Sequence, residues 1–276
     1  MQWIDSATDR AGRELPPRLL EHSDQPLALF VDIDGTLVDF ARRPTEVRLD
    51  ADLLGVLARL QHLLDGALAV LSGRDLDDVD RLLKPLKLPA GALHGLQCRD
   101  ASGRVRSLLP PPVWATRVGR ECEMLAESLP GVWLERKAKV AFALHYRDAP
   151  EHGACVLGAA AAIADRSGGR YRLQPGNCVA ELKPAGADKG DALASLLQAP
   201  PFRDRAPLML GDDLTDEPAF AMAQRLGGAG IIVGTRRPTC ARHALGSPRH
   251  TGRWLAALAT RLEQARAAGD TRGGPP

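Results

Sequence analysis

Two patterns of hydrophobic residues alternate along this chain: continuous apolar runs and apolar residues at helical spacing. Four continuous apolar runs are typical of buried strands: residues 27–31, 67–71, 208–210 and 231–233. Between and after them, apolar residues at helical spacing or acid-led segments predict helices at residues 53–64, 75–83, 189–197, 220–225 and 251–267. A third short strand is expected at residues 92–94. Strands that alternate with helices in this way indicate a doubly wound parallel sheet of the α/β class.

The middle of the chain has a different order. Three prolines at 110–112 are typical of a stiff linker, and a Pro-Ala-Gly sequence follows at 184–186. Between them we expect helices at residues 113–129 and 150–165, and strands at residues 133–147, 171–173 and 178–182. This α+β pattern, in which we expect antiparallel hairpins, predicts a smaller domain inserted into the sheet-forming domain. The predicted segments are 1–107 for the first part of the core, 108–184 for the insertion and 185–276 for the second part of the core.

The inserted segment carries charged residues in a period of two. In residues 133–147, Lys137 and Lys139 share the parity opposite to the apolar residues, and Glu181 does the same in its own strand. If residues 133–147 form one continuous strand, both lysines project from one face; a turn near Ala138 would remove that inference. A solvated sheet face explains this pattern as well as a binding surface does.

Composition excludes several classes of protein. The 276 residues have a formal net charge of +2 with scattered basic residues and few aromatic ones, so no nucleic-acid-binding surface is expected. No apolar run reaches the ~20 residues of a membrane helix, and no secretory leader is recognisable. The five cysteines are widely spaced without a CxxC pair, which supports neither a zinc site nor a disulfide framework. We therefore expect a cytoplasmic protein.

The most informative polar residues are two acids that follow the first apolar run. Asp32 and Asp34 arrive just where the predicted strand ends, and ligands bind at the carboxyl ends of strands in open parallel sheets. Two adjacent carboxylates are costly unless a cation neutralises them. One acid could attack phosphorus while the other moves protons, with a hard cation between them. A strand that ends in a solvated turn is the alternative.

Further polar residues lie at other strand ends and helix starts. Ser72 and Gly73 follow the second strand, Lys189 begins a predicted helix, and Asp212 and Asp213 follow a third strand. Each feature alone has an ordinary explanation, namely a helix N-cap, a solvated lysine or acids that interact with a helix dipole. Together they predict an anion-binding and cation-binding centre at one edge of the sheet.

These residues form four ordered signatures that resemble those of haloacid-dehalogenase-like (HAD) phosphatases. The signatures are DxDGT at residues 32–36, then residues 70–74, Lys189 and residues 210–217. The resemblance implies that Asp32 is the nucleophile and Asp34 the general acid and base. It implies a phosphate-binding set and a Mg²⁺ site. The phosphate-binding residues would be Ser72, Gly73, Arg74 and Lys189, and the metal residues Asp32, Asp34 (through its carbonyl), Asp212 and Asp213, with Asp216 supporting them.

A narrower resemblance covers almost the whole chain. Residues 93–95, 134–147, 181–184 and 211–217 are similar to the corresponding motifs of trehalose-6-phosphate phosphatases. The resemblance implies hydrolysis of trehalose 6-phosphate, an inserted cap that determines specificity and closes over the sugar, and a functional link to a trehalose-6-phosphate synthase. The substrate-binding residues it implies are Lys137, Lys139, Glu181 and His94. Two alternatives remain: the same chemistry on another sugar phosphate such as sucrose 6-phosphate, and an inactive regulatory subunit that binds a synthase.

Overall fold

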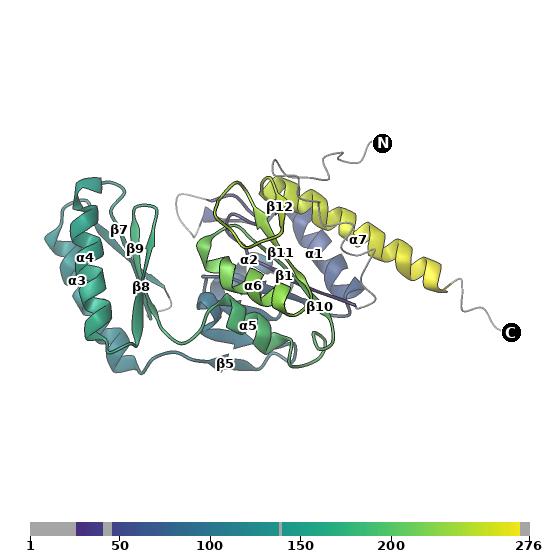
Figure 1. The fold of residues 1–276 in the computed structure, drawn as a ribbon, viewed down its shortest axis with the longest axis horizontal. Helices are drawn as coiled ribbons and strands as arrows, with labels where there is room; N and C mark the ends of the chain where they lie inside the picture. The colour runs from purple at the N-terminus through teal and green to yellow at the C-terminus, as the bar shows by residue number, and fades with distance from the viewer. Residues whose placement is uncertain (1–25, 41–45, 138–139, 271–276) are drawn as a thin grey trace. The chain divides into compact units, whose positions relative to one another are not determined.

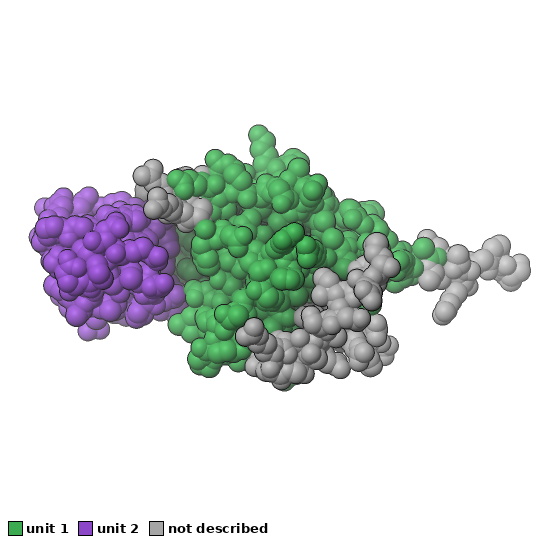
Figure 2. Space-filling view, turned by 90° about the horizontal axis from the view of Figure 1, so that it is seen from above, with its two compact units in different colours: residues 1–106, 188–276 green, residues 107–187 purple. Residues whose placement is uncertain are grey.

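A computed structural model describes residues 26–40, 46–137 and 140–270, with the backbone alone for 268–270. The chain divides into two compact units. Unit 1 comprises residues 1–106 and 188–276, and unit 2 comprises residues 107–187 (Figures 1 and 2). Unit 2 is therefore an insertion within the sequence of unit 1.

Unit 1 is built on one eight-stranded sheet with the strand order β12-β11-β10-β1-β2-β3-β4-β5. Each strand from β12 to β3 pairs in parallel with its neighbour, and β4 pairs antiparallel with β3. The strands are β1 (Leu27–Val31), β2 (Leu68–Leu71), β3 (Ala90–Ala92), β4 (Gln97–Arg99), β5 (Val105–Ser107), β10 (Ala206–Gly211), β11 (Ala229–Val233) and β12 (His243–Leu245).

Helices lie on both faces of this sheet. They are α1 (Ala51–Leu63), α2 (Leu76–Leu83), α5 (Lys189–Leu196), α6 (Glu217–Arg225) and α7 (Pro248–Asp270). The crossover through α1 leads from β1 to β2, whereas the crossover through α6 leads from β10 in the opposite direction to β11. Because such crossovers are right-handed, α1 and α6 cover opposite faces. Helix α7 packs beside α1, and α5 packs beside α6 (Figure 1).

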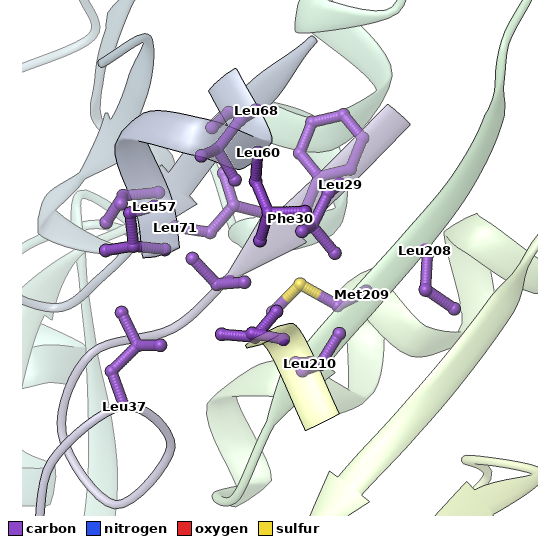
Figure 3. Close-up of a cluster of buried hydrophobic side chains, with 14 of the residues drawn as sticks. Leu29, Phe30, Leu37, Leu57, Leu60, Leu68, Leu71, Leu208, Met209 and Leu210 are labelled. Atoms are coloured by element: carbon purple, nitrogen blue, oxygen red, sulfur yellow. The ribbon is translucent and has the colours of Figure 1, made fainter. Parts of the chain in front are cut away.

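The core of unit 1 explains the continuous apolar runs. A strand covered by helices on both faces has no solvated side, so both parities of its side chains must be apolar. Residues 28–31 of β1 are all fully buried, and so are residues 68–71 of β2. Figure 3 shows Leu29 and Phe30 of β1 among side chains of α1, β2 and β10.

Unit 2 has a four-stranded antiparallel sheet with the order β6-β7-β9-β8. One face of the sheet packs against helices, and its core contains Phe142, Leu144 and Leu182. The elements of this unit are α3 (Pro112–Ser128), β6 (Trp133–Lys137), β7 (Ala141–His145), the 3₁₀ helix η4 (Pro150–His152), α4 (Gly153–Arg166), β8 (Tyr171–Gly176) and β9 (Val179–Pro184).

The predicted fold class, a doubly wound α/β core with a smaller inserted α+β unit, is confirmed. The structure differs from the prediction in its short elements, because β4, β5 and β12 have three residues each and were not expected. The strand expected at residues 92–94 ends at Ala92, and the 3₁₀ turn η3 (Leu93–Gly95) follows. In the described part of the chain, no helix has the length and apolar content that crossing a membrane requires.

Residues 133–147 form a hairpin, which is the alternative to one continuous strand and agrees with the antiparallel hairpins expected in this segment. Strand β6 ends at Lys137 and pairs antiparallel with β7, which begins at Ala141. This hairpin removes the argument that Lys137 and Lys139 share a face because they share a parity. Lys139 itself lies outside the described residues.

Candidate active site

The site forms where the direction of the chain through the sheet reverses. Strands β1 and β10 are neighbours, but the chain proceeds from β1 toward β2 and from β10 toward β11. Such a reversal leaves a crevice at the carboxyl ends of the two strands. The N–H of Asp32 donates to the carbonyl of Leu210 at 2.9 Å, which extends the pairing of the two strands. Asp32 and Asp212 therefore emerge side by side.

A tight turn follows β1 and brings the chain against Asp212. The carbonyl of Ile33 accepts hydrogen bonds from the N–H groups of Leu37 and Val38. Gly35 has a φ of +78°, and a Cβ atom there would lie 2.2 Å from Oδ2 of Asp212. Only glycine meets both conditions. The hydroxyl of Thr36 donates to Oδ1 of Asp212 at 3.2 Å and orients that carboxylate.

Lys189 is a buried cation at the start of α5. The Asp188 carboxylate accepts from the N–H of Asp191 at 3.0 Å, which caps the helix and fixes its first residue. The Nζ atom of Lys189 donates to Oδ1 of Asp32 at 2.7 Å and to Oδ1 of Asp216 at 2.6 Å. Burial lowers the pKa of Lys189, but the charges of Asp216 and Asp32 outweigh it and raise the pKa above its ordinary value.

Three carboxylates surround this lysine. Ligand atoms of Asp32, Asp212 and Asp216 all lie within 4.8 Å of one another. Burial raises the pKa of Asp32 well above its ordinary value, and the neighbouring acids Asp216 and Asp212 add to the effect against the attraction of Lys189. Burial and the charge of Asp216 raise the pKa of Asp212 to about 7. One ammonium group therefore does not balance the acids.

This donor set fits a hard divalent cation. Mg²⁺ binds oxygen at 2.0–2.1 Å, so opposite ligands lie roughly 4.2 Å apart, a separation that carboxylates already within 4.8 Å need little movement to reach. Asp32 and Asp212 are the best candidates for direct ligands. Asp216 already accepts from Lys189 through Oδ1 and, through Oδ2, from the N–H groups of Asp212 and Asp213 at 2.9 and 3.0 Å.

Asp213 and Asp216 have different positions in this arrangement. Asp213, a predicted metal residue, is exposed, and its carboxylate is not part of the three-acid group. Asp216 is completely buried and holds the loop that carries Asp212. Asp216 thus contacts the backbone beside Asp212, and the roles of Asp213 and Asp216 toward a metal stay predictions.

The predicted phosphate-binding loop follows β2. Ser72 is buried, and its Oγ accepts from the N–H of Arg74 at 3.2 Å. The η3 turn supports the loop, because the N–H of Leu93 donates to the carbonyl of Arg74 and the N–H of His94 donates to the carbonyl of Ser72, both at 2.9 Å. The His94 ring packs on Gly73, where a Cβ atom would lie 2.7 Å from two ring atoms. His94, predicted to bind substrate, thus contacts the loop that carries Ser72.

Asp34 and Arg74 form an ion pair with two hydrogen bonds. Nε and Nη2 of Arg74 donate to Oδ2 and Oδ1 of Asp34, each at 2.6 Å. Nη1 of Arg74 pairs with Asp78. The structure thus joins the predicted proton-transfer acid to a residue predicted to bind phosphate.

The sheet face of unit 2 that lies opposite the helices is polar. Register places Glu135, Ala143, Glu181 and Gln174 in one row across its four strands. Nζ of Lys137 donates to Oε1 of Glu181 at 3.2 Å. Two of the three predicted residues of this unit, Lys137 and Glu181, are therefore in contact.

Sequence reasoning missed several residues of both units. Thr36 lies within the DxDGT pattern, which could have indicated it, whereas no local signal marks Arg236, whose guanidinium donates to the carbonyls of Asp212 and Asp213. On the polar face of unit 2, Glu135 pairs with Nε2 of His145 at 2.9 Å, and Trp133 stacks on that imidazole. The alternation of β6 places Glu135 on the same face as Lys137, so the sequence pattern could have indicated Glu135.

Comparison with known proteins gives one consistent family. A family model described as trehalose-phosphatase matches residues 30–244. A trehalose-6-phosphate phosphatase of Escherichia coli (strain K12) is 38% identical over 239 residues, which cover 87% of this chain and 89% of that protein. A probable trehalose-phosphate phosphatase of Sinorhizobium fredii is 40% identical over 220 residues, covering 80% and 82%.

Solved structures agree with this result. The C-terminal domain of a C. albicans trehalose-6-phosphate phosphatase superposes with a TM-score of 0.73 at 25% identity. The match covers 86% of this chain and 93% of that domain, so it includes both units.

Proposed function

Because this chain belongs to the trehalose-phosphatase family, we propose that it is an enzyme that hydrolyses trehalose 6-phosphate to trehalose and inorganic phosphate. The observation that carries the phosphatase chemistry is the group formed by Asp32, Lys189 and Asp212 at the switch point of the sheet, whereas the choice of sugar rests on the family. In this proposal residues 108–184 form the domain that determines substrate specificity. The cytoplasmic location and the link to a synthase stay predictions.

The proposed reaction has two steps. In the first, the Asp32 carboxylate attacks phosphorus, the bond from phosphorus to the sugar oxygen breaks, and Asp34 gives its proton to that oxygen. In the second, Asp34 takes a proton from a water molecule that attacks the aspartyl-phosphate, which frees phosphate and restores Asp32. Lys189, held at 2.7 Å from Asp32, would stabilise the negative charge on the transferring group. Ser72 and the N–H groups beside Gly73 would bind phosphate oxygens.

The proposed cofactor is Mg²⁺, held by Asp32 and Asp212 together with the Asp34 carbonyl. When bound, it would neutralise charge on the phosphoryl oxygens. Asp216 and Thr36 would then keep the Asp212 carboxylate in place through the hydrogen bonds described above.

Sugar recognition is assigned to the polar face of unit 2. Lys137 and Glu181 would donate to and accept from glucose hydroxyls, as the family resemblance implies, and Glu135 shares their face and their row. A site of fixed, largely buried hydrogen-bonding groups discriminates strongly, because a wrong ligand leaves those groups unpaired. His94 would act through the phosphate loop, on which it packs.

Phosphate release from a panel of sugar phosphates tests the proposal. We expect kcat/KM for trehalose 6-phosphate to exceed that for glucose 6-phosphate by at least about 10²-fold. Sucrose 6-phosphate belongs in the panel because the core residues alone do not select the sugar. A higher kcat/KM for sucrose 6-phosphate would make that compound the substrate in place of trehalose 6-phosphate. No phosphate release from any sugar phosphate would favour a non-catalytic binding protein.

The elevated pKa of Asp212 predicts a pH-dependent stability in the absence of metal. Its pKa of about 7 lies above the ordinary value of 3.8, so the folded protein binds this proton more tightly than the unfolded chain does. The free energy of unfolding should therefore fall as the pH rises from about 4 to about 7. Asp212→Asn removes this loss. At about pH 8 in EDTA, its Tm should exceed that of the wild type by at least ~2 °C.

Two comparisons make this thermal test specific. Mg²⁺ should raise the Tm of the wild type at this pH but not that of Asp212→Asn, because a ligand stabilises only the state that binds it. Asp52→Asn, which changes an exposed acid on α1 away from the site, should keep the Mg²⁺ effect. A lower Tm of Asp212→Asn across the whole pH range would contradict the electrostatic interpretation.

A further inference from the structure

The guanidinium of Arg74 is held by two carboxylates. Its Nε and Nη2 atoms form the two 2.6 Å bonds to Asp34, and its Nη1 atom pairs with Asp78. The Arg74 side chain is only 8% exposed. Asp78 is itself fixed, because it lies in the first turn of α2 and its N–H donates to Oδ1 of the N-cap Asp75 at 2.8 Å. A rigid helix start thus anchors the arginine that contacts Asp34.

We propose that Arg74 is a positioning residue for Asp34, which sets the orientation of that carboxylate for proton transfer, and not a phosphate ligand. The ion pair favours the charged carboxylate that takes a proton from water, and the pair loosens while Asp34 carries that proton. The inference rests on the proposed function, in which Asp34 moves the protons. A planar guanidinium that donates two parallel hydrogen bonds fixes both the place and the plane of a carboxylate, which a point charge cannot do.

The local charge also argues against a phosphate-binding role. Asp78 accepts from Arg74 on one oxygen and from Arg81 on the other. The two arginines and the two acids, Asp34 and Asp78, sum to zero formal charge. Within this group of four described side chains, a phosphate dianion beside Arg74 would meet two carboxylates whose charge already balances that of the arginines, whereas Lys189 lies directly at the proposed nucleophile.

Arg74→Lys tests this role, because it keeps the charge and removes the two-pronged geometry. We expect kcat for trehalose 6-phosphate to fall at least ~30-fold, a part of the roughly 10²-fold to 10⁴-fold that proton transfer by a positioned side chain contributes. KM and the inhibition constant of inorganic phosphate should change less than about threefold. The initial burst of nitrophenolate from p-nitrophenyl phosphate should also change less than about threefold, because this leaving group departs without a proton.

A double-mutant cycle separates positioning from a general structural effect. In an Asp34→Asn background, Arg74→Lys should change the nitrophenolate burst and the Tm little, and any loss on an alkyl phosphate should be less than about twofold. The matched control is Arg81→Lys, the same exchange at the other partner of Asp78, which should leave kcat within about twofold. If Arg74→Lys does not fold, Asp78→Asn should lower kcat about 3-fold to 10-fold without changing phosphate inhibition.

Three results would overturn the inference. A raised inhibition constant for phosphate with equal losses on both substrates would make Arg74 a phosphate ligand. A loss that persists undiminished in the Asp34→Asn background would give it a purely structural role, and unchanged kcat would give it none. If the wild type does not hydrolyse trehalose 6-phosphate, the proposed function fails. The same comparison on whichever alkyl phosphate the protein cleaves still decides the role of Arg74.

Discussion

Asp32→Asn is expected to lower the turnover of trehalose 6-phosphate by at least ~10³-fold, because a neutral amide cannot form the aspartyl-phosphate. The substitution should not unfold the protein. Asp32 is buried among acids that raise its pKa, so an amide of the same shape removes a charge repulsion while Lys189 keeps its bond to Asp216.

Trapping of the intermediate gives the measurement. Rapid acid quenching with substrate labelled in the phosphoryl group should leave label on the wild type, releasable by hydroxylamine, and none on the variant. Asp52→Asn, an exposed acid on α1, serves as the control and should keep both label and turnover. Retention of more than about 1% of wild-type turnover by Asp32→Asn would exclude covalent catalysis by this residue.

Glu181→Ala is expected to lower kcat/KM for trehalose 6-phosphate by about 10²-fold or more, equivalent to at least ~2.7 kcal/mol of transition-state stabilisation. The carboxylate would accept hydrogen bonds from sugar hydroxyls far from phosphorus. Binding energy from such remote groups is used to position the reacting ones, so kcat should fall as well. Removing Glu181 also removes the 3.2 Å hydrogen bond that orients Lys137, which increases the loss.

Comparison with a substrate that has no sugar isolates the recognition effect. The variant should hydrolyse a small aryl phosphate within about threefold of the wild-type rate. The control is Glu121→Ala, which removes a carboxylate paired with Arg166 on the helical layer of the same unit and should leave both rates within about twofold. Equal losses on both substrates would mean that Glu181 supports the fold. No loss on either substrate would mean that this polar face is solvated surface without a role in recognition.

The architecture of the core could be predicted because burial on both faces forces continuous apolar strands. The apolar run at 27–31 and the acids that follow it predicted the position of the site. Lys189 was predicted to lie at a helix start, and it is the first residue of α5, after the N-cap Asp188. Three-residue strands such as β12 are too short to leave a periodic signal. Alternation alone could not decide between one continuous strand and the hairpin of β6 and β7, because it continues through a hairpin when an odd number of residues separates the strands.

Partners of charged side chains were the least predictable feature of the site. Asp34 and Arg74 are 40 residues apart in sequence, and their contact depends on β1 and β2 being neighbours, which sets where the two loops meet. Asp78 did have a local signal, because it lies one helical turn after Arg74. The burial of Asp216, in contrast to the exposure of Asp213, depends on the approach of α5 and could not be read from spacing.

The order of the strands also determines when this protein can fold. Strand β1 lies between β2, which follows it closely in the chain, and β10, which is synthesised only after the whole of unit 2. Lys189 and Asp32, which meet in the site, are 157 positions apart. A nascent chain that has not reached residue 206 therefore exposes one apolar edge of β1 with its N–H and C=O groups unpaired. Incomplete chains should be slow to gain structure and prone to aggregate during synthesis, in proportion to the time that unit 2 takes to emerge from the ribosome.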